Sequence, residues 1–489
     1  MIDLTIHEEQ LKRTVQRARE RNILIPTFAQ MKNPELIPAK VKEELKGIGL
    51  WDVNPRNLFR ITWKNEPVAQ GGGFGGVNWI EWPSSLTGTS ARIIQLIGKW
   101  FPTGAHKVGA TFGCLVPRLV TGQFDPTYHR AVWPSTGNYC RGGAYDAALL
   151  ACESIAILPA EMSRERFEWL SMVAGEVIAT PGCESNVKEI FDKCWELKRE
   201  RGDKVFIFNQ FDEFGNYLWH YDVTGHAMVE VLEQVMGPRD EFRGIALTTG
   251  SAGTIGCGDY LKQVVSPNVK VAAGEALQCP TLLLNGFGGH RIEGIGDKHV
   301  PWIHNVKNTD LVIAVDDESS MSLARLFNEP AGRRYLVKQG VPEAVVEKLD
   351  LLGISGIANL LQTIKMAKWY EAGEQDVFVT VGTDSMELYQ SRMREMHEAH
   401  GEYTECDAAA DFHRHLLGQD KDNMLELDYW DRKRVHNLKY YTWVEQQGKT
   451  YPEIQDQWYG RDYWTDFQKQ LPEIDALIEQ FNEMTGLLK

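Results

Sequence analysis

The chain of 489 residues contains no long apolar run and no excess of positive charge. No stretch of about 18 apolar residues is present, and residues 1–25 show no charged-then-apolar signal peptide. The formal net charge of −15 argues against a nucleic-acid footprint and against a membrane-surface patch. We therefore expect a globular protein whose partners are neither nucleic acids nor membranes.

Cysteine is sparse and shows no metal-binding spacing. The eight cysteines are scattered, and no two of them form a CxxC pair. This spacing argues against a zinc knuckle and against a disulfide scaffold, so no metal site is predicted. We expect buried, reduced thiols and a cytoplasmic protein.

The usual nucleotide-binding loops are also missing. Residues 71–76 read GGGFGG, but no strong strand precedes them and no helix follows closely. A flexible or tightly turned connection is the favoured interpretation, and a phosphate cradle is the weaker alternative.

From about residue 92, short apolar segments alternate with helical patterns. Strands are predicted at 93–97, 131–133, 155–158, 176–179, 205–208, 245–248, 269–273, 311–315 and 377–381. Helices are predicted at 107–119, 137–151, 164–173, 186–200, 224–235, 254–264 and 319–327, with another from residue 357. This alternation predicts an α/β protein with mostly parallel sheets, in which ligands bind in loops at the carboxyl ends of strands.

The two ends of the chain differ from this pattern. Residues 1–62 are charged and helix-prone, and the segment from about residue 395 is rich in tryptophan and tyrosine. Acidic residues are as common as basic ones in the aromatic segment, which disfavours base stacking on nucleic acid. We expect that segment to pack against the main body or against a second subunit.

One lysine occupies an unusual position. Lys107 follows the turn-forming residues 102–106, PTGAH, and opens a run of small and apolar residues with helical periodicity. Burying a lysine is costly unless it is paired or reactive, and a desolvated lysine can form a Schiff base with a carbonyl compound. A solvated surface lysine is the alternative.

Three further loops follow predicted strands and open predicted helices. Ser135 and Thr136 lie just before Asn138, and hydroxyls at a helix start form either an anion site or an N-cap. Residues 249–254, TGSAGT, form either a cradle for one phosphate monoester or a tight turn. Ser355 opens the third helix. A lysine, an amide, a phosphate cradle and a hydroxyl together suit a phosphorylated aromatic aldehyde, for which pyridoxal phosphate is the obvious candidate.

From about residue 91 to residue 389, the order of these motifs resembles the cysteine synthase and tryptophan synthase β-chain family, the fold-type II pyridoxal-phosphate enzymes. Further segments are similar to that family: 158–163, 209–211, 289–296 and 353–355. His106 before the lysine is closer to the tryptophan synthase β chain, but Ser135 stands where that chain has an acidic residue. The nearest resemblance is therefore to cysteine synthase-like members.

The resemblance implies how pyridoxal phosphate is held. Lys107 would form the Schiff base, Asn138 would bond the phenolic oxygen, and Ser355 would face the pyridine nitrogen. His106 would lie near the phosphate. The residues implied to hold the phosphate are Gly250, Ser251, Ala252, Gly253 and Thr254.

The resemblance also implies how the substrate carboxylate is held, by Ser135 and Thr136 with Gln210. Two residues depart from the family pattern: Ala252 replaces the usual glycine, and Tyr139 replaces the usual small residue after the asparagine.

The fold implied is two parallel-sheet domains of the tryptophan synthase β-like kind with helical extensions at both ends, in a homodimer. The expected parts are an N-terminal extension (1–75), a large cofactor-binding domain (76–129 and 236–394), a smaller substrate-side domain (130–235) and an aromatic-rich C-terminal extension (395–489).

The activity implied is β-elimination or β-replacement on a serine- or cysteine-type amino acid through an aminoacrylate intermediate. Lys107 would take the Cα proton as a general base. A serine at the pyridine nitrogen does not enforce a positive ring, which favours loss of a Cβ leaving group over transamination. The alternatives are a threonine or serine dehydratase and a non-catalytic, cofactor-binding regulatory protein.

Overall fold

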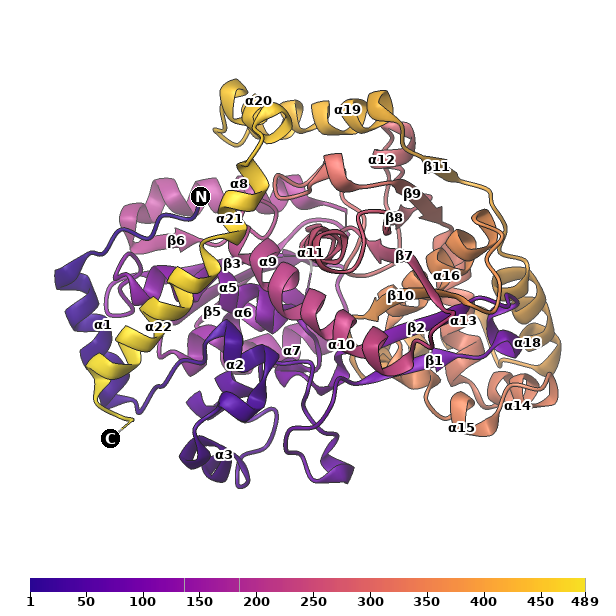
Figure 1. Cartoon of the computed structure of the whole chain (residues 1–489), viewed down its shortest axis with the longest axis horizontal. Coiled ribbons are helices and arrows are strands. Elements are labelled where there is room, and N and C mark those ends of the chain that lie inside the picture. Colours follow the sequence, from indigo (N-terminus) through magenta and orange to yellow (C-terminus); the bar gives the residue numbers. More distant parts are fainter. Residues whose placement is uncertain (136, 184, 489) are drawn as a thin grey trace.

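The computed structural model describes residues 1–135, 137–183 and 185–488. Within these residues two β-sheets are flanked by helices (Figure 1). The larger sheet has seven strands in the order β1-β2-β10-β7-β8-β9-β11, and the smaller has four in the order β5-β4-β3-β6. The predicted α/β fold with two sheets is confirmed.

The central part of the larger sheet is parallel. Its parallel strands are β2 (Arg92–Ile97), β7 (Glu241–Thr248), β8 (Lys270–Ala276), β9 (Leu311–Val315) and β10 (Asp376–Gly382). Helix α16 (Ile354–Trp369) packs on β7 and β10. All five residues of β9 are buried, as is usual for strands covered on both faces, and this explains the continuous apolar runs in the sequence.

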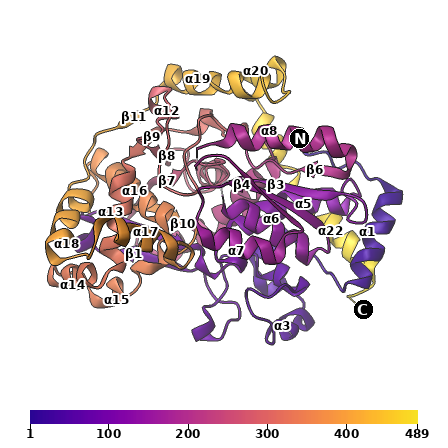
Figure 2. The ribbon, with the colours of Figure 1, turned by 180° about the vertical axis from the view of Figure 1, so that it is seen from behind.

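The smaller sheet is parallel throughout. Its strands are β3 (Arg130–Pro134), β4 (Glu153–Pro159), β5 (Glu176–Thr180) and β6 (Val205–Ile207). The connecting helices are α6 (Asn138–Leu149), α7 (Arg164–Val173) and α8 (Val187–Arg201). Helix α8 covers one face, while α6 and α7 lie on the other (Figure 2).

Two edge strands of the larger sheet were not predicted. β1 (Trp79–Trp82) pairs antiparallel with β2, and β11 (Met424–Glu426) pairs antiparallel with β9. Both are very short, so neither gives a clear alternation of apolar and polar residues in the sequence. β11 lies in the predicted C-terminal extension, so that extension completes the larger sheet.

The other helices extend the two layers and cover their ends. They are α1 (Glu8–Glu20), α2 (Phe28–Lys32), α3 (Ala39–Leu45), α4 (Ser84–Thr87), α5 (Lys107–Val120), α9 (Phe214–Trp219), α10 (Gly225–Val235), α11 (Gly256–Val264), α12 (Thr281–Leu284), α13 (Asp317–Asn328), α14 (Pro330–Lys338), α15 (Glu343–Val346), α17 (Gln390–His400), α18 (Glu405–Asp411), α19 (Tyr429–Asn437), α20 (Tyr451–Tyr459), α21 (Tyr463–Gln468) and α22 (Leu471–Thr485). Among the described helices, none is both long and apolar enough to cross a membrane.

The two ends of the chain pack against each other and against the main body. Helix α22 contacts α1 and α5, and Figure 1 shows it running alongside α1. The side chain of Asn482 in α22 forms two hydrogen bonds with the backbone of Ile25, at 2.7 and 2.9 Å. The terminal segments are therefore part of the folded body around α5, whose first residue is Lys107.

Candidate active site

Strand ends from both sheets meet around one pocket. Residues that directly follow β3, β7 and β10 line it, including Ser135, Gly250 and Thr383. The structure brings together all the predicted site residues that it describes: His106, Lys107, Ser135, Asn138, Gln210, Gly250, Ser251, Ala252, Gly253, Thr254 and Ser355. The predicted Thr136 lies outside the described residues.

Lys107 enters the pocket from the first turn of α5. The chain turns sharply a few residues earlier, where Thr103 has φ 67° and Gly104 has φ 71°. A left-handed conformation is strained for a β-branched residue such as threonine, and such strain is common where a side chain must be held in a fixed place. The amine of Lys107 donates a hydrogen bond to Ser251 Oγ at 3.1 Å. The lysine therefore reaches the loop predicted to hold a phosphate.

Aromatic residues of the N-terminal segment pack against the turn that precedes Lys107. A Cβ atom at Gly104 would lie 2.9 Å from the ring of Trp51. The ring of Trp63 lies 5.5 Å from the ring of His106. The predicted N-terminal extension thus contacts both sides of the lysine turn.

Residues 250–254 form an open nest of backbone N–H groups at the start of α11. Within the described part of the chain, none of these five N–H groups donates a hydrogen bond to another residue. Asn216 fixes the loop, because its amide donates to Ser251 Oγ at 2.9 Å and to the Gln210 carbonyl at 3.0 Å. Convergent N–H groups at a helix start attract an anion.

Ala252 pays a conformational cost in this loop, with φ at 62°. The left-handed conformation costs alanine about 1–2 kcal/mol. Glycine avoids this cost, but it has more conformational freedom in the unfolded chain, which offsets part of the gain. We expect Ala252→Gly to raise the free energy of unfolding of the cofactor-free protein by about 1 kcal/mol in denaturant titrations. Ala246→Gly, in strand β7, should lower it. A lower stability for Ala252→Gly would contradict this interpretation of the loop.

Ser135 and Gln210 form the part of the pocket predicted to hold a carboxylate. Gln210 Nε2 donates to Ser135 Oγ at 3.2 Å, and the same oxygen accepts the backbone N–H of Gly137 at 3.1 Å. A Cβ atom at Gly137 would collide with the guanidinium of Arg166, so the loop requires glycine there.

Asn138 is held by a residue that the sequence did not reveal. Its amide donates to Asp384 Oδ2 at 2.6 Å, and the same oxygen accepts the Tyr389 hydroxyl at 2.7 Å. The backbone of Asp384 also accepts the N–H of Gly353, just before Ser355. Burial raises the pKa of Asp384, while the charge of Arg166 opposes the shift. Asp384 therefore links the predicted phenolic-oxygen and pyridine-nitrogen contacts.

A buried ion-pair network stands behind the carboxylate loop. Glu293 lies between two guanidinium groups, at 2.5 Å from Arg166 Nη1 and 2.6 Å from Arg392 Nε. Arg166 is fully buried, and its Nη2 also donates to the Tyr389 hydroxyl at 3.1 Å. This network fixes the guanidinium against which Gly137 packs.

Removing the central carboxylate should be costly. Glu293→Ala leaves two cations facing each other in a buried site, so we expect a loss of about 3–5 kcal/mol in the free energy of unfolding. Glu395 pairs with the same Arg392 but is about half exposed, and Glu395→Ala should cost less than about 1 kcal/mol. If chemical denaturation showed the same loss of unfolding free energy for Glu293→Ala and Glu395→Ala, burial would not explain the importance of the Glu293 carboxylate.

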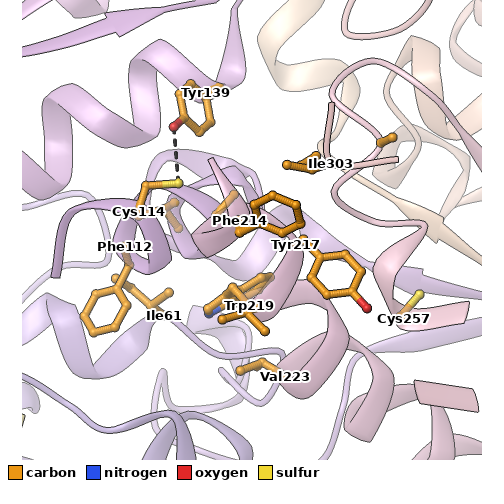
Figure 3. Packing of buried hydrophobic residues seen from close by; sticks show 14 of the residues in the cluster. Ile61, Phe112, Cys114, Tyr139, Phe214, Tyr217, Trp219, Val223, Cys257 and Ile303 are labelled. Atoms are coloured by element: carbon orange, nitrogen blue, oxygen red, sulfur yellow. Dashed lines mark hydrogen bonds between the residues drawn. The ribbon is translucent and has the colours of Figure 1, made fainter. Parts of the chain in front are cut away.

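Tyr139 and His106 are the chain neighbours of two predicted cofactor residues, Asn138 and Lys107. Tyr139 lines the pocket, and its hydroxyl donates to Cys114 Sγ at 3.4 Å in the core (Figure 3). The departure at this position is thus accommodated by packing. Burial, together with the charge of Lys107, holds the pKa of His106 well below its usual range, so its imidazole is neutral. Its Nε2 lies 3.2 Å from the Thr383 hydroxyl.

Several pocket residues were not predicted as site residues, although three of them, Phe211, Gly294 and Ile295, lie in segments that resemble the family. They are Phe211, Thr248, Gly294, Ile295, Asp297, Asn359, Val381 and Thr383. Of these, Asp297 is an acidic side chain that directly follows the segment 289–296, which resembles cysteine synthases. That adjacency was the one available clue, because a lone aspartate in a loop has no pattern of its own.

The residues present fit pyridoxal phosphate. The N–H nest at 250–254 suits a phosphate monoester, and the Lys107 amine reaches this loop. The buried Asn138 Oδ1 has no hydrogen-bond partner among the described residues, which points to a polar group inside the pocket. The Ser355 hydroxyl lines the same space. Together these are the donor and acceptor types that a phosphorylated hydroxypyridine aldehyde requires.

Comparison with known proteins agrees with this fit. The profile of a family described as pyridoxal-phosphate dependent enzyme matches residues 101–333. A cysteine synthase from Staphylococcus aureus is 30% identical over 262 residues, which cover 53% of this chain and 75% of the relative. A cystathionine beta-synthase from Saccharomyces cerevisiae is 26% identical over 318 residues, covering 63% of this chain and 59% of the relative.

A solved structure has the same fold. The crystal structure of a cysteine synthase from Entamoeba histolytica superposes with a TM-score of 0.56 at 21% identity, covering 69% of this chain and 93% of that one. The residues matched by the family profile, 101–333, include Lys107, Ser135 and the 250–254 loop. The chain belongs to the family of pyridoxal-phosphate-dependent enzymes.

Proposed function

We propose that this enzyme catalyses β-elimination or β-replacement on a serine- or cysteine-type amino acid. One observation carries the proposal: the Lys107 amine, the 250–254 nest and the Ser135–Gln210 pair line a single pocket. These residues would give the pocket an amine, a phosphate site and a carboxylate site for one small amino acid. The relatives named cysteine synthase and cystathionine beta-synthase support this reaction class.

Each group in the pocket has a separate task. The 250–254 nest would hold the cofactor phosphate, Asn138 its phenolic oxygen and Ser355 its ring nitrogen. Pyridoxal phosphate, when bound, withdraws electrons from the amino-acid Cα and so makes its proton acidic. Lys107 would hold the cofactor and, once released by the incoming amine, would accept the Cα proton.

A second group of residues would orient the substrate. Ser135 and Gln210, with Thr136, would bind its carboxylate through hydroxyl and amide donors. Asp384 would keep the Asn138 amide in place through its 2.6 Å hydrogen bond. Because Ser355 offers a neutral hydroxyl, it does not enforce a charged ring, which favours departure of a group from Cβ.

We also propose the domain division, oligomeric state and location implied by the resemblance. Residues 130–235, which contain the smaller sheet, would form the substrate-side domain, and 76–129 with 236–394 the cofactor domain. A homodimer is supported by exposed aromatic side chains on α19 and α20, such as Trp430 and Tyr459. A cytoplasmic location is supported by eight cysteines without a disulfide.

Product analysis tests the proposed reaction. The cofactor-loaded protein would be incubated with serine, cysteine or O-acetylserine, with and without a thiol acceptor. We expect pyruvate and ammonia, or a β-substituted amino acid, from at least one of them. Transamination or racemisation products without any loss from Cβ would contradict the proposal. A protein that binds the cofactor but converts none of these amino acids would favour a regulatory role.

A further inference from the structure

Asp297 is an acidic residue in the pocket to which the family resemblance gives no role. Its side chain is 7% exposed, and it lines the same pocket as Lys107. Its Oδ2 is buried and has no hydrogen-bond partner among the described residues. A buried carboxyl oxygen without a partner is costly, and such groups in native proteins are often functional.

The surrounding loop holds this carboxyl in one place. Gly294 and Gly296 adopt φ of 95° and 71°, which lets the loop bend sharply against the phosphate nest. The Gly296 N–H donates to the Thr249 carbonyl at 2.8 Å. The Thr281 hydroxyl donates to the Asp297 backbone carbonyl at 2.8 Å. Both anchors act on the backbone and leave the carboxyl group to the pocket.

The surroundings of Asp297 favour its protonated form. Burial raises the pKa of Asp297 to about 8, and the charge of Lys107 opposes the shift. The Cys279 thiol feels the charge of Asp297, His106 lines the same pocket, and His290 and His299 lie in the same stretch of chain, as does the adjacent Lys298. Burial raises the pKa of this thiol and lowers the pKa of each of these imidazoles, so the thiol and the imidazoles are neutral at pH 7. Asp297 therefore carries a transferable proton at neutral pH.

We propose that Asp297 is the general acid that protonates the atom leaving from Cβ, and that the substrates are amino acids with a free hydroxyl or thiol at Cβ rather than O-acylated serines. The inference rests on the proposed function. Hydroxide is a strongly basic leaving group and thiolate a moderately basic one, so both gain from protonation as they depart. Acetate and chloride are weak bases and need no such help.

The proton balance closes with water as the only further reagent, because in an elimination the Asp297 carboxylate regains its proton from water. The Cα proton passes to Lys107, and its electron pair forms the Cα=Cβ double bond. The Cβ–O or Cβ–S bond breaks, its electron pair leaves with oxygen or sulfur, and the proton of Asp297 joins that atom to give water or hydrogen sulfide. In a replacement reaction, the incoming nucleophile returns its proton to the Asp297 carboxylate as the new bond to Cβ forms.

Leaving-group dependence tests the proposal on the cofactor-loaded enzyme. Asp297→Asn keeps the shape but holds no transferable proton. We expect its kcat/KM to fall about 100-fold or more with serine and cysteine, and less than about threefold with β-chloroalanine. Retained turnover of β-chloroalanine would also show that the variant folds. Asp203→Asn, an exposed surface change, should match the wild type with all three substrates.

Other outcomes would overturn the inference. An equal loss with all leaving groups, no loss with any, or a wild-type preference for O-acetylserine over both serine and cysteine would each contradict the general-acid role. In those cases the wild type still acts at Cβ, so the proposed function stands. A wild-type enzyme that converts none of these amino acids would instead contradict the proposed function and the inference together.

A pH titration gives a readout that does not depend on turnover. Burial also raises the pKa of other carboxyls, such as those of Asp146 and Glu275, so the readout is the infrared difference between the loaded wild type and loaded Asp297→Asn. This difference should contain the band of one protonated carboxyl at pH 6, and that band should be lost as the pH rises through about 8. The wild-type rate with serine should fall as pH rises through the same range, because the acid form is the active one. Loss of the band below pH 5 would refute the assignment.

Discussion

Lys107→Ala is expected to lower kcat by about 10⁴-fold or more. The substitution removes the proposed Schiff-base amine and the proposed base for the Cα proton at once. The phosphate nest at 250–254 does not depend on this side chain, so the variant should still bind the cofactor non-covalently. Single-turnover assays with serine and cysteine, together with cofactor absorbance, measure both properties.

A second lysine variant controls for general effects of the substitution. Lys188 is exposed on α8 and pairs with Asp192 at 2.5 Å on the same helix. Lys188→Ala should keep kcat within about twofold of the wild type, because surface pairs contribute little. Normal turnover in Lys107→Ala would refute the assignment of this lysine.

Gly253→Ala is expected to weaken cofactor binding by about 10- to 100-fold. A Cβ atom at this position would collide with Asn216 Oδ1, and the amide of that side chain holds Ser251 and the Gln210 carbonyl. Such overpacking costs about 1–3 kcal/mol, and each 1.4 kcal/mol corresponds to about tenfold in affinity. Titration of the cofactor-free protein with pyridoxal phosphate, followed by absorbance, measures the dissociation constant.

The glycine-rich residues 71–76 provide the matched control. A Cβ atom at Gly76 would meet nothing within 4 Å, so Gly76→Ala should leave cofactor affinity unchanged. Asn65 and Phe74 form an isolated bridge across this loop, which fits the turned connection favoured by the sequence. If Gly76→Ala lost cofactor affinity and Gly253→Ala kept it, the assignment of the phosphate site to residues 250–254 would be wrong.

Most of the fold could be predicted from local sequence patterns. Each predicted strand and helix between residues 92 and 381 appears in the structure, with ends shifted by a few residues. Continuous apolar runs in buried parallel strands give a strong signal, as at β9, where the predicted and observed ends coincide. The short edge strands β1 and β11 were missed because three or four residues do not establish a period.

The loops of the site were predicted from local chemistry and from the resemblance, and the structure brings the described ones together. The groups that support them were not predictable. Asn138 and Asp384 are 246 residues apart in the chain, and nothing in either neighbourhood indicates that they meet. The role of Asp297 could not be predicted either, because its pKa is raised by burial that exists only in the folded protein.

The role of the terminal segments also required the structure. The sequence showed charged helices at one end and aromatics at the other, without saying what they cover. In the structure Trp51 packs against the lysine turn, and Lys439 is buried with its amine bonded to the Trp302 and His304 carbonyls at 2.9 and 2.8 Å. Contacts of this kind arise from tertiary packing and leave no periodic signal in the sequence.

Borohydride reduction followed by peptide mass spectrometry tests the central claim most directly. Reduction of the loaded enzyme converts a Schiff base into a stable secondary amine, so the modified lysine can be located. The account predicts one phosphopyridoxyl group per chain, on the peptide that contains Lys107. A modification on another lysine, or none in a protein that has bound pyridoxal phosphate, would contradict it.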